Sequence, residues 1–417
     1  MFTTRLRFLT AGESHGPMLT AVLEGIPAGL ALDSEIIDVD LERRQRGFGA
    51  GPRMKIEQDH AEIISGVMGG KTIGSPISIM IANKNHDKWK GVPIDPFIKP
   101  RPGHADLTGL IKYGYDDIRP ALERASARET ASRVSVGAVC KHFLKQFSIQ
   151  VFGYVTAIGD ISTDLSSTPL EERGRLAENS TVRCPDPIAS KEMINRIRQV
   201  MDNRDTIGGI IETVTLNLPP GLGSHVHWDR KLDARLGGAI LGIQAIKGVE
   251  FGSAFENTRL PGTSVQDPIC LNKSNSKVGK NQGGTENSLP ESDKIPTESR
   301  LLVRPSCRSG GLEGGITTGQ PLVIRSAMKP IATTLSPQNT VDLASGEETQ
   351  TQYERSDFCP VPRAVPIVEA MVSFILADAL LEKLGGDSMD ELLKRYSQLR
   401  QANLDDLILK NETQIFW

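Results

Sequence analysis

Residues 70–82 (GKTIGSPISIMIA) and residues 315–328 (GITTGQPLVIRSAM) repeat one pattern about half a chain length apart. Each copy opens with Gly-x-Thr-x-Gly-x-Pro, whose residues favour tight turns, and continues into an apolar run that is typical of a strand. Two matching turn–strand units indicate an internally duplicated architecture. Chance is the competing explanation, because Gly, Thr and Pro are common in turns.

Strand-like and helix-like runs are interspersed along the rest of the chain. Further strands are predicted at 150–157 and 210–216, and helices at 119–147, 190–204, 232–247 and 367–384. The last of these helices is apolar on nearly all sides and is followed by two glycines, which indicates a buried helix. Ser388 and Glu391 have the spacing of a capping box and predict the start of another helix.

The charge and cysteine content of the chain restrict its class. Its 417 residues include 48 basic and 51 acidic side chains, a net charge of −3, which indicates neither nucleic acid nor an anionic membrane as a partner. The five cysteines are scattered without a C-x-x-C pair, so a disulfide framework or a metal site is disfavoured and a reducing compartment is favoured. Without a signal peptide or an apolar run long enough to cross a membrane, we expect a cytoplasmic protein.

Residues 264–300 differ in composition from the remainder. They are polar, rich in Gly, Ser and Asn, and lack periodicity, which predicts a mobile surface insertion within a single domain spanning 1–417. A plain loop is the favoured interpretation of this insertion, and a lid over a site is the alternative.

Residues 12–16 (GESHG) match G-x-S-x-G, the turn on which serine hydrolases present their nucleophile. That turn follows a strand inside a parallel sheet, and so few residues precede Gly12 that a nucleophilic Ser14 is disfavoured. Residues 65–72 (SGVMGGKT) resemble a phosphate-binding loop, but Ser65 stands where the first glycine is required. His15 is therefore the more informative residue of the first segment.

Arginines gather in clusters that also contain small residues. The clusters are RRQRGFGAGPRM (43–54) and RPALERASARETASR (119–133), and single arginines open RPGHAD (101–106) and RSD (355–357). On the predicted helix, Arg124 and Arg128 would share one face. Because Arg suits bidentate contacts with carboxylates and phosphates, the clusters favour a polyanionic small molecule as ligand. The alternative is a solvated basic face with Glu123 and Glu129 as local partners.

Two histidines and one aspartate are candidates for proton transfer. His15 and His104 lie in turns that contain glycine, and histidine titrates near neutral pH. Asp357 stands close to Arg355 and would become a base if its pocket excluded water. The other five histidines lack comparable settings, and we expect no metal site.

Four long segments together resemble the chorismate synthase family. They are GESHGPMLTAVLEGIPAGL (12–30), DLERRQRGFGAGPRMKIEQD (40–59), RPGHADLTGLIKYGYDDIRPALERASARETASRVSVGA (101–138) and RSDFCPVPRAVPIVEAM (355–371). DTIGGIIETV, AIKGVEFG, GGLEGGITTGQP and KPIATT also occur in the order that this family shows. The likeness runs from about residue 5 to about residue 384 and is interrupted by 264–300.

The resemblance implies a lyase that converts 5-enolpyruvylshikimate 3-phosphate to chorismate and phosphate by anti-1,4-elimination. This is the last step of the shikimate pathway, which serves aromatic amino acid biosynthesis. The family uses FMN in its reduced form without net redox change. Its fold is α+β, a layered sandwich of helices and antiparallel sheets, and it assembles as a homotetramer. The phosphate and two carboxylates of the substrate, beside the FMN phosphate, would account for the arginine clusters.

The resemblance also implies roles for individual residues. His15 and His104 match the histidines that protonate the leaving phosphate and the reduced flavin, and Asp357 matches the aspartate near flavin N5 that helps to take the substrate proton. The substrate-binding positions are Arg44, Arg53 and Arg128. The FMN-binding positions are Arg124, Ala125, Ser126, Gln244, Ala245, Gly314, Lys329, Pro330, Ile331, Ala332, Thr333 and Arg355.

Three positions depart from the family pattern: Ala50 stands where Arg is common, Phe48 where Tyr is common, and Cys307 where Asn is common. These departures leave open a second hypothesis, a flavin- or anion-binding protein without turnover. The sequence also leaves open whether the enzyme reduces its own flavin with NADPH (NADP as a second cofactor), although no G-x-G-x-x-G follows a strand.

Overall fold

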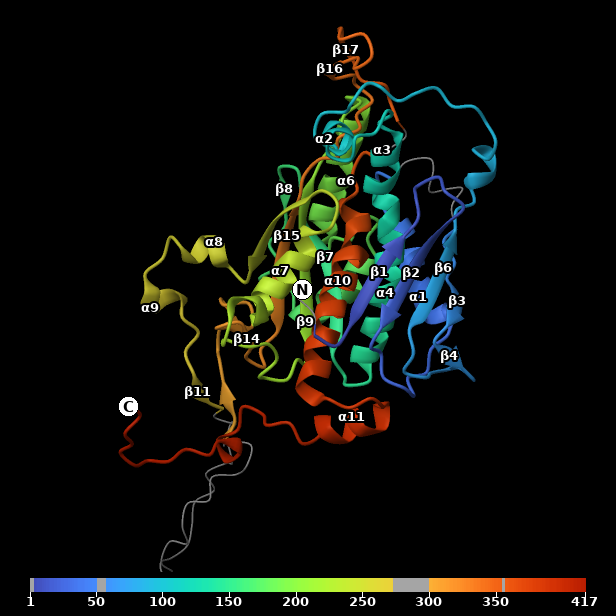
Figure 1. Ribbon diagram of the computed structural model, residues 1–417. Helices are drawn as coiled ribbons and strands as arrows, with labels where there is room; N and C mark the ends of the chain where they lie inside the picture. The colour runs from blue at the N-terminus through green and yellow to red at the C-terminus, as the bar shows by residue number, and fades with distance from the viewer. Residues whose placement is uncertain (1–3, 51–57, 273–299, 355–356) are drawn as a thin grey trace, which may run out of the picture.

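The computed structural model of the chain describes residues 4–50, 58–272, 300–354 and 357–417. It contains two larger antiparallel sheets with long helices packed between them (Figure 1). The first sheet has the order β1 (Arg7–Ala11), β2 (Met18–Glu24), β6 (Ile77–Ala82), β3 (Glu62–Ser65). The second has the order β10 (Ile246–Phe251), β15 (Leu322–Met328), β9 (Gly209–Leu216), β7 (Gln150–Ile158), β8 (Ile161–Ser162). The expected mixture of helices and antiparallel sheets is confirmed.

Four helices form the interior of the molecule, and smaller elements surround them. The interior helices are α1 (Ser34–Gln45), α4 (Thr130–Lys145), α7 (Leu232–Leu241) and α10 (Val361–Leu384). Helix α4 packs on β2 and β6, α10 packs on β7 and β9, and the two helices pack on each other. The outer helices are α2 (Asp106–Tyr113), α3 (Arg119–Ala125), α5 (Leu170–Glu178), α6 (Pro187–Asp202), α8 (Ala254–Asn257), α9 (Gly262–Val265) and α11 (Met389–Tyr396).

Short ribbons and 3₁₀ turns complete the described elements. The ribbons are β4 (Val67–Met68) with β5 (Lys71–Thr72), β11 (Cys270–Leu271) with β12 (Leu302–Val303), β13 (Leu312–Glu313) with β14 (Ile316–Thr317), and β16 (Asn339–Val341) with β17 (Glu348–Gln350). The 3₁₀ turns are η2 (His86–Lys88), η3 (Ala127–Glu129), η4 (Trp228–Arg230) and η6 (Leu404–Asp406). Most of the predicted 264–300 insertion, residues 273–299, lies outside the described residues.

The two larger sheets share one strand order, β1-β2-β6-β3 in the first and β7-β9-β15-β10 in the second, with β8 added at one edge. The repeated turns before β6 and β15 also make matching bonds. In each turn a buried threonine hydroxyl donates to a proline carbonyl. The same hydroxyl accepts from the N–H of the leucine that lies three residues after that proline. The bonded residues are Thr72 with Pro27 and Leu30 in the first turn, and Thr317 with Pro219 and Leu222 in the second.

Two predicted helices are wrong in their extent. The helix expected at 119–147 is divided into α3, η3 and α4, because Ser126 has an extended backbone with ψ of 140° and its hydroxyl accepts from the N–H of Arg128. The helix expected at 232–247 ends at Leu241, because Ala245 takes a positive φ of 65° and β10 begins at the next residue. The strands expected at 77–82 and 322–328 are confirmed as β6 and β15.

Helix α10 is the centre of the core, as its apolar sequence predicts. It is long and apolar enough to cross a membrane, but its apolar window is completely buried inside the protein, which identifies a core helix. The closest approach is at Gly137 of α4, where an added Cβ would lie 2.1 Å from the Cβ of Ala370. Only glycine therefore permits this crossing of α4 and α10.

Asp378 ties the beginning of the chain to α10. Its carboxylate is fully buried, accepts from the N–H groups of Thr4, Arg5 and Leu6, and pairs with the equally buried Arg235 of α7. Backbone and guanidinium donors together compensate the cost of burying this charge. The first strand is thus fixed to the last long helix of the core.

Glu369 of α10 provides a test of core electrostatics. Burial raises the pKa of this carboxyl, but the charges and hydrogen bonds of Arg43 and Lys141 outweigh burial and bring it to about 2, from 4.5. A carboxyl whose pKa is lower in the folded than in the unfolded chain stabilises the fold at pH values above its unfolded pKa. That contribution is lost as the pH falls through its folded pKa. We expect Glu369→Gln to be less stable than the parent near neutral pH, and the difference to shrink as pH falls from about 5 to about 3.

Urea unfolding at several pH values measures this difference. Glu171→Gln on the exposed face of α5 is the matched control and should follow the parent at every pH. A stability difference between parent and Glu369→Gln that stays constant over this pH range would contradict the assignment.

Candidate active site

The N-terminal ends of two long helices meet at the candidate site. Helix α4 begins at Thr130 and α10 at Val361, and neither has an acidic residue in its first turn. The two ends are neighbours, because Arg44 Nε donates to Thr130 Oγ1 at 3.0 Å while the Arg44 carbonyl accepts from Arg363 Nε at 3.0 Å. Helix N-termini carry partial positive charge, so this end of the helix layer favours anions.

His15 lies in the loop between β1 and β2 and is held by Glu123 of α3. Its Nδ1 is 2.7 Å from Glu123 Oε1, and its backbone N–H donates to Glu123 Oε2 at 2.7 Å. The Trp89 ring packs against the imidazole with centroids 4.3 Å apart, and His86 Nδ1 donates to the His15 carbonyl. Burial raises the pKa of Glu123, but its bonds to His15 and the charge of Arg119 outweigh burial and lower it.

Ser14 is buried beside the break between α3 and η3. Ser126 Oγ donates to Ser14 Oγ at 3.2 Å, which joins the β1–β2 loop to that break. The loop connects two antiparallel strands, whereas the hydrolase turn connects a strand to a helix. The structure therefore agrees with the rejection of a hydrolase elbow at Ser14.

Arg44 and Arg128 meet on one buried carboxylate, Asp59. Arg128 Nη1 donates to Asp59 Oδ1 at 2.6 Å and Arg44 Nη1 to Oδ2 at 3.2 Å, while Arg128 Nε donates to Asn83 Oδ1 at 2.8 Å. Burial lowers the pKa of Arg44 to about 9, with Asp59 opposing the shift and the nearby Arg363 adding to it. Within the described part of the chain, Arg128 Nη2 is buried without a hydrogen-bond partner.

His104 belongs to a second cluster, at the start of α2. Its Nδ1 is 2.5 Å from Asp106 Oδ1, and Asp106 also accepts two bonds from the Arg101 side chain. Burial raises the pKa of Asp106, but bonds from His104 and Arg101 outweigh it and hold it well below its usual range. Arg101 Nη1 donates to Thr333 Oγ1 at 2.9 Å, and Lys329 Nζ donates to the Gly103 carbonyl at 3.0 Å.

The stretch 329–333 therefore lies against the His104 cluster, and its role in FMN binding stays a prediction. It follows β15 directly, so the strand fixes its start. The Ile331 carbonyl accepts from Thr206 Oγ1 at 2.8 Å, and the Ala332 Cβ lies close to Gly103. The stretch also includes Pro330.

The remaining predicted FMN positions lie between these clusters. Arg124 Nη2 donates to the Thr10 carbonyl at 3.2 Å, and Ala125 and Ser126 follow it at the end of α3. Gln244 Nε2 donates to Glu129 Oε2 at 3.2 Å, and the carbonyl of the next residue, Ala245, accepts from the Lys329 N–H at 2.9 Å. In the described part of the chain, Gln244 Oε1 is a buried acceptor without a partner.

The structure places two further predicted residues, Asp357 and Gly314, in different regions. Asp357 pairs with Arg363 at the start of α10, so it sits at the helix ends next to Arg44. Gly314 lies in the turn between β13 and β14, before β15, whereas Lys329 follows the other end of that strand. Within one copy of the chain, Gly314 therefore lies away from the other predicted FMN-binding positions. Arg53 and Arg355 lie outside the described residues.

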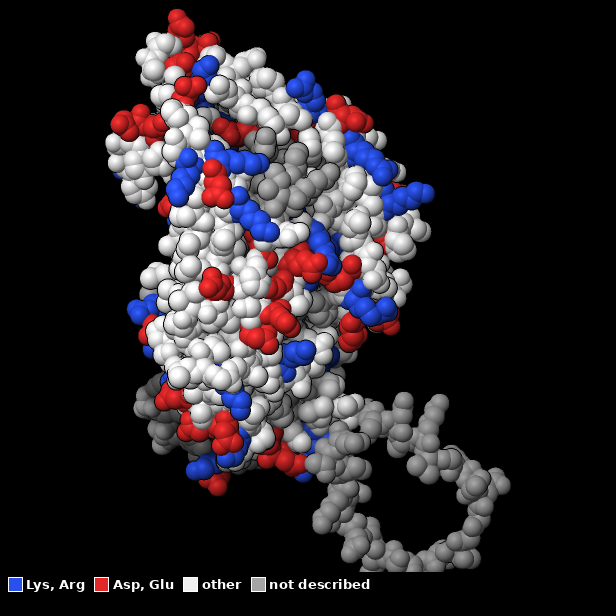
Figure 2. Space-filling model, turned by 90° about the vertical axis from the view of Figure 1, so that its right-hand side faces the viewer, with Lys and Arg blue, Asp and Glu red and all other residues white. Residues whose placement is uncertain are grey.

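The arginines of these clusters repel one another less than the sequence suggests, because acidic side chains pair with them. Arg43 pairs with Asp40, Glu178 and Glu369, and Arg133 pairs with Glu129. The expectation that Arg124 and Arg128 share a helical face is wrong, because Ser126 separates them. On the face shown in Figure 2, Lys and Arg side chains are interspersed with Asp and Glu. Arg44 and Arg128, in contrast, are buried at the helix ends, where both pair with Asp59.

Sequence reasoning named Glu123 and Glu129 only as local partners of the arginines, and Glu129 does pair with Arg133. It missed most of the acidic contacts of the site. Asp59, Asp106 and Glu123 each hold a predicted arginine or histidine, and Asn83 holds Arg128. Of these partners, only Asp106 could have been identified from sequence spacing, because it lies two residues after His104. The other contacts join residues far apart in the chain, and no local pattern marks them.

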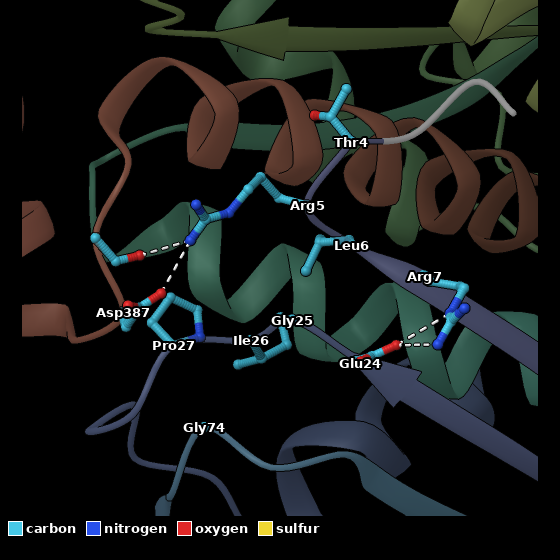
Figure 3. Close-up of a pocket in the computed structure, with 11 residues that line it drawn as sticks. Thr4, Arg5, Leu6, Arg7, Glu24, Gly25, Ile26, Pro27, Gly74 and Asp387 are labelled. Carbon is cyan, nitrogen blue, oxygen red and sulfur yellow. Dashed lines mark hydrogen bonds and ion pairs between the residues drawn. The ribbon is translucent and has the colours of Figure 1, made fainter.

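A cavity of about 530 Å³ lies elsewhere, between the β1–β2 edge and the turn after α10 (Figure 3). Its two arginines are already paired, Arg5 with Asp387 and Arg7 with Glu24. It contains none of the predicted site residues, so we do not assign it to the chemistry. Among the described residues, no group of three or more His, Cys, Asp or Glu side chains could hold a metal ion.

Comparisons with known proteins identify the family of the chain. Residues 6–381 match the family model described as chorismate synthase. Chorismate synthase of Trichlorobacter lovleyi is 47% identical over 396 residues, 93% of this chain and 96% of its own length; that of Aquifex aeolicus is 48% identical over 408 residues, 94% and 96%. A solved structure titled "Crystal Structure of Chorismate Synthase" superposes with a TM-score of 0.74 at 42% identity, covering 95% of this chain and 97% of its own. The chain therefore belongs to the chorismate synthase family and is a lyase of the chorismate-forming step of the shikimate pathway.

Proposed function

We propose that the protein converts 5-enolpyruvylshikimate 3-phosphate to chorismate and phosphate by anti-1,4-elimination, with reduced FMN bound beside the substrate. In this reaction a ring C–H bond and the C–O bond to phosphate break, and a new C=C bond forms. The catalyst must accept the ring proton and stabilise the departing phosphate. It must also bind the phosphate and two carboxylates of the substrate.

The observation that carries this proposal is the meeting of two buried arginines, Arg44 and Arg128, at paired helix N-termini, beside the loop that holds the His15–Glu123 pair. The His104–Asp106 pair lies in the second cluster, at the start of α2. Arg44 and Arg128 share one carboxylate, Asp59, so one positive charge is left for a ligand. Arg128 Nη2 offers a buried donor that a phosphate or carboxylate oxygen would satisfy. The two helix ends add partial positive charge.

The residues present fit FMN. Gln244 Oε1 is a buried, unsatisfied acceptor suited to an N–H of a flavin ring, and Lys329 and Arg124 supply cations for its phosphate. The positive φ of Ala245 turns the backbone sharply beside Gln244. Reduced FMN supplies reversible electron donation next to the substrate without net redox change.

The roles of the chain's own residues follow from their contacts. His15, whose Nδ1 is bonded to Glu123, donates its other ring proton to the leaving phosphate. His104, bonded to Asp106, carries a proton on the flavin side, where Lys329 and Thr333 lie. Asp357, which pairs with Arg363, is the base on the path of the ring proton.

An anaerobic assay tests this proposal. With photoreduced FMN, the protein should release phosphate from 5-enolpyruvylshikimate 3-phosphate, and it should release none with oxidised FMN. Tight FMN binding without phosphate release would identify a non-catalytic flavin-binding protein. A parallel aerobic reaction with and without NADPH tests whether the enzyme reduces its own flavin.

We also propose that the layered fold arose by internal duplication, as a single catalytic domain. The shared strand order and the matching bonds of Thr72 and Thr317 support this origin. Family membership supports a cytoplasmic homotetramer, and a tetramer would offer a second copy's Gly314 to the site. Sedimentation of the purified protein measures the assembly.

A further inference from the structure

We propose that Glu123 is a positioning residue that fixes which ring nitrogen of His15 exchanges its proton. This inference rests on the proposed role of His15 as the acid for the leaving phosphate. Glu123 lies on α3, more than a hundred residues after His15, so no local motif links them.

Glu123 makes three contacts with the loop residues Ser14 and His15. Its Oε1 contacts His15 Nδ1 at 2.7 Å, its Oε2 accepts from the His15 N–H at 2.7 Å, and its carbonyl accepts from the Ser14 N–H at 3.3 Å. The Glu123 and His15 side chains are only 11% and 18% exposed. With both oxygens engaged and little water access, the carboxylate has one orientation relative to the ring.

An ionised carboxylate only accepts hydrogen bonds, so His15 Nδ1 must carry a proton in both the neutral and the charged ring. The pKa of Glu123 is lowered, with bonds to His15 outweighing burial, which keeps the acceptor in place. Proton exchange therefore takes place at Nε2. The packed ring of Trp89 adds a second restraint on the orientation of the imidazole.

The two histidine–carboxylate pairs differ in how the carboxylate is shared. Asp106 accepts from Arg101 as well as from His104, so part of its charge is neutralised by a guanidinium. Among the described residues, no Lys or Arg forms an ion pair with Glu123, and His15 is its ionic partner. Glu123 thus gives both its carboxylate oxygens to His15, while Arg119 adds its charge nearby.

Glu123→Gln tests this inference with nearly unchanged shape. Its amide oxygen can still accept from the His15 N–H, but its NH₂ group then faces Nδ1 and favours the tautomer protonated at Nε2. We expect nitrogen NMR of ¹⁵N-histidine-labelled, flavin-free protein at about pH 8 to show this change of tautomer. The His15 signal is assigned by its loss in His15→Ala. We expect kcat to fall by about 10²-fold with KM little changed.

Two variants complete the test. Glu123→Asp keeps an acceptor-only group and should retain the Nδ1–H tautomer and recover activity relative to the glutamine variant. Asp229→Asn removes the partner of a surface histidine, His227, at 2.8 Å, and should leave turnover unchanged. An unchanged His15 tautomer in Glu123→Gln would overturn the proposal whatever the activity. A changed tautomer with full turnover would instead overturn the catalytic role of His15.

Discussion

Replacing His15 with alanine is expected to lower kcat by about 10²- to 10⁴-fold, the usual contribution of a positioned acid. The expectation follows from the rigid setting of the ring, which Glu123 bonds at 2.7 Å and Trp89 covers. Removing the imidazole also leaves the largely buried Glu123 carboxylate without its ionic partner, so we expect some loss of stability, and the rate is compared on protein shown to be folded. Phosphate release under anaerobic conditions, with reduced FMN in excess, measures the effect.

His227→Ala is the matched control for this experiment. His227 also bonds a carboxylate through Nδ1, but its side chain is 61% exposed and it lies directly before η4, outside the candidate site. Its removal should leave kcat unchanged. Equal rates for parent and His15→Ala would remove His15 from the mechanism and leave the phosphate without a proton donor.

Replacing Asp59 with asparagine is expected to lower the free energy of unfolding by about 3–5 kcal/mol, the cost of leaving a buried charge unpaired. The Asp59 side chain is fully buried and those of Arg44 and Arg128 are each 4% exposed. An asparagine has one acceptor oxygen for two guanidinium groups, and its NH₂ group would face one of them donor to donor. The two arginines should also lose their positions, so KM for the anionic substrate should rise.

Urea unfolding of the parent and Asp59→Asn measures the loss of stability, provided that the urea dependence of both has the same slope. Asp390→Asn breaks a surface ion pair with Lys394 of similar length, 2.7 Å, and should have no measurable effect. If both variants unfold at the same urea concentration, Asp59 does not compensate the two buried arginines.

Elements with a strong local signal were predictable from the sequence. The repeated turns predicted β6 and β15 to the residue, because each apolar run is bounded by turn residues. The helix start predicted at Ser388 is confirmed, with the Glu391 N–H donating to Ser388 Oγ. The return bond of a capping box is displaced by one residue, because the Glu391 carboxylate accepts from the Asp387 N–H instead of that of Ser388. Local chemistry decides these positions.

Positions decided by distant contacts were not predictable. Ser126 interrupts a run with good helix propensity, where its hydroxyl accepts from the Arg128 N–H and also donates to Ser14, which arrives from the β1–β2 loop. The predicted helix 232–247 overran because nothing in its periodicity marks the positive φ of Ala245. The histidines and arginines of the site were identified from their motifs, but their carboxylate partners come from other elements.

The bond between Asp378 and residues 4–6 has a consequence for how the chain is made. The first strand leaves the ribosome before its anchor exists, and more than 370 residues separate Asp378 from Thr4. At about 5–20 residues per second, roughly 20–75 s pass before α10 can bind it. Until then the amide groups of residues 4–6 have only solvent or chaperones as partners. Completion of this contact is therefore a late event of synthesis, set by the helix that carries Asp378.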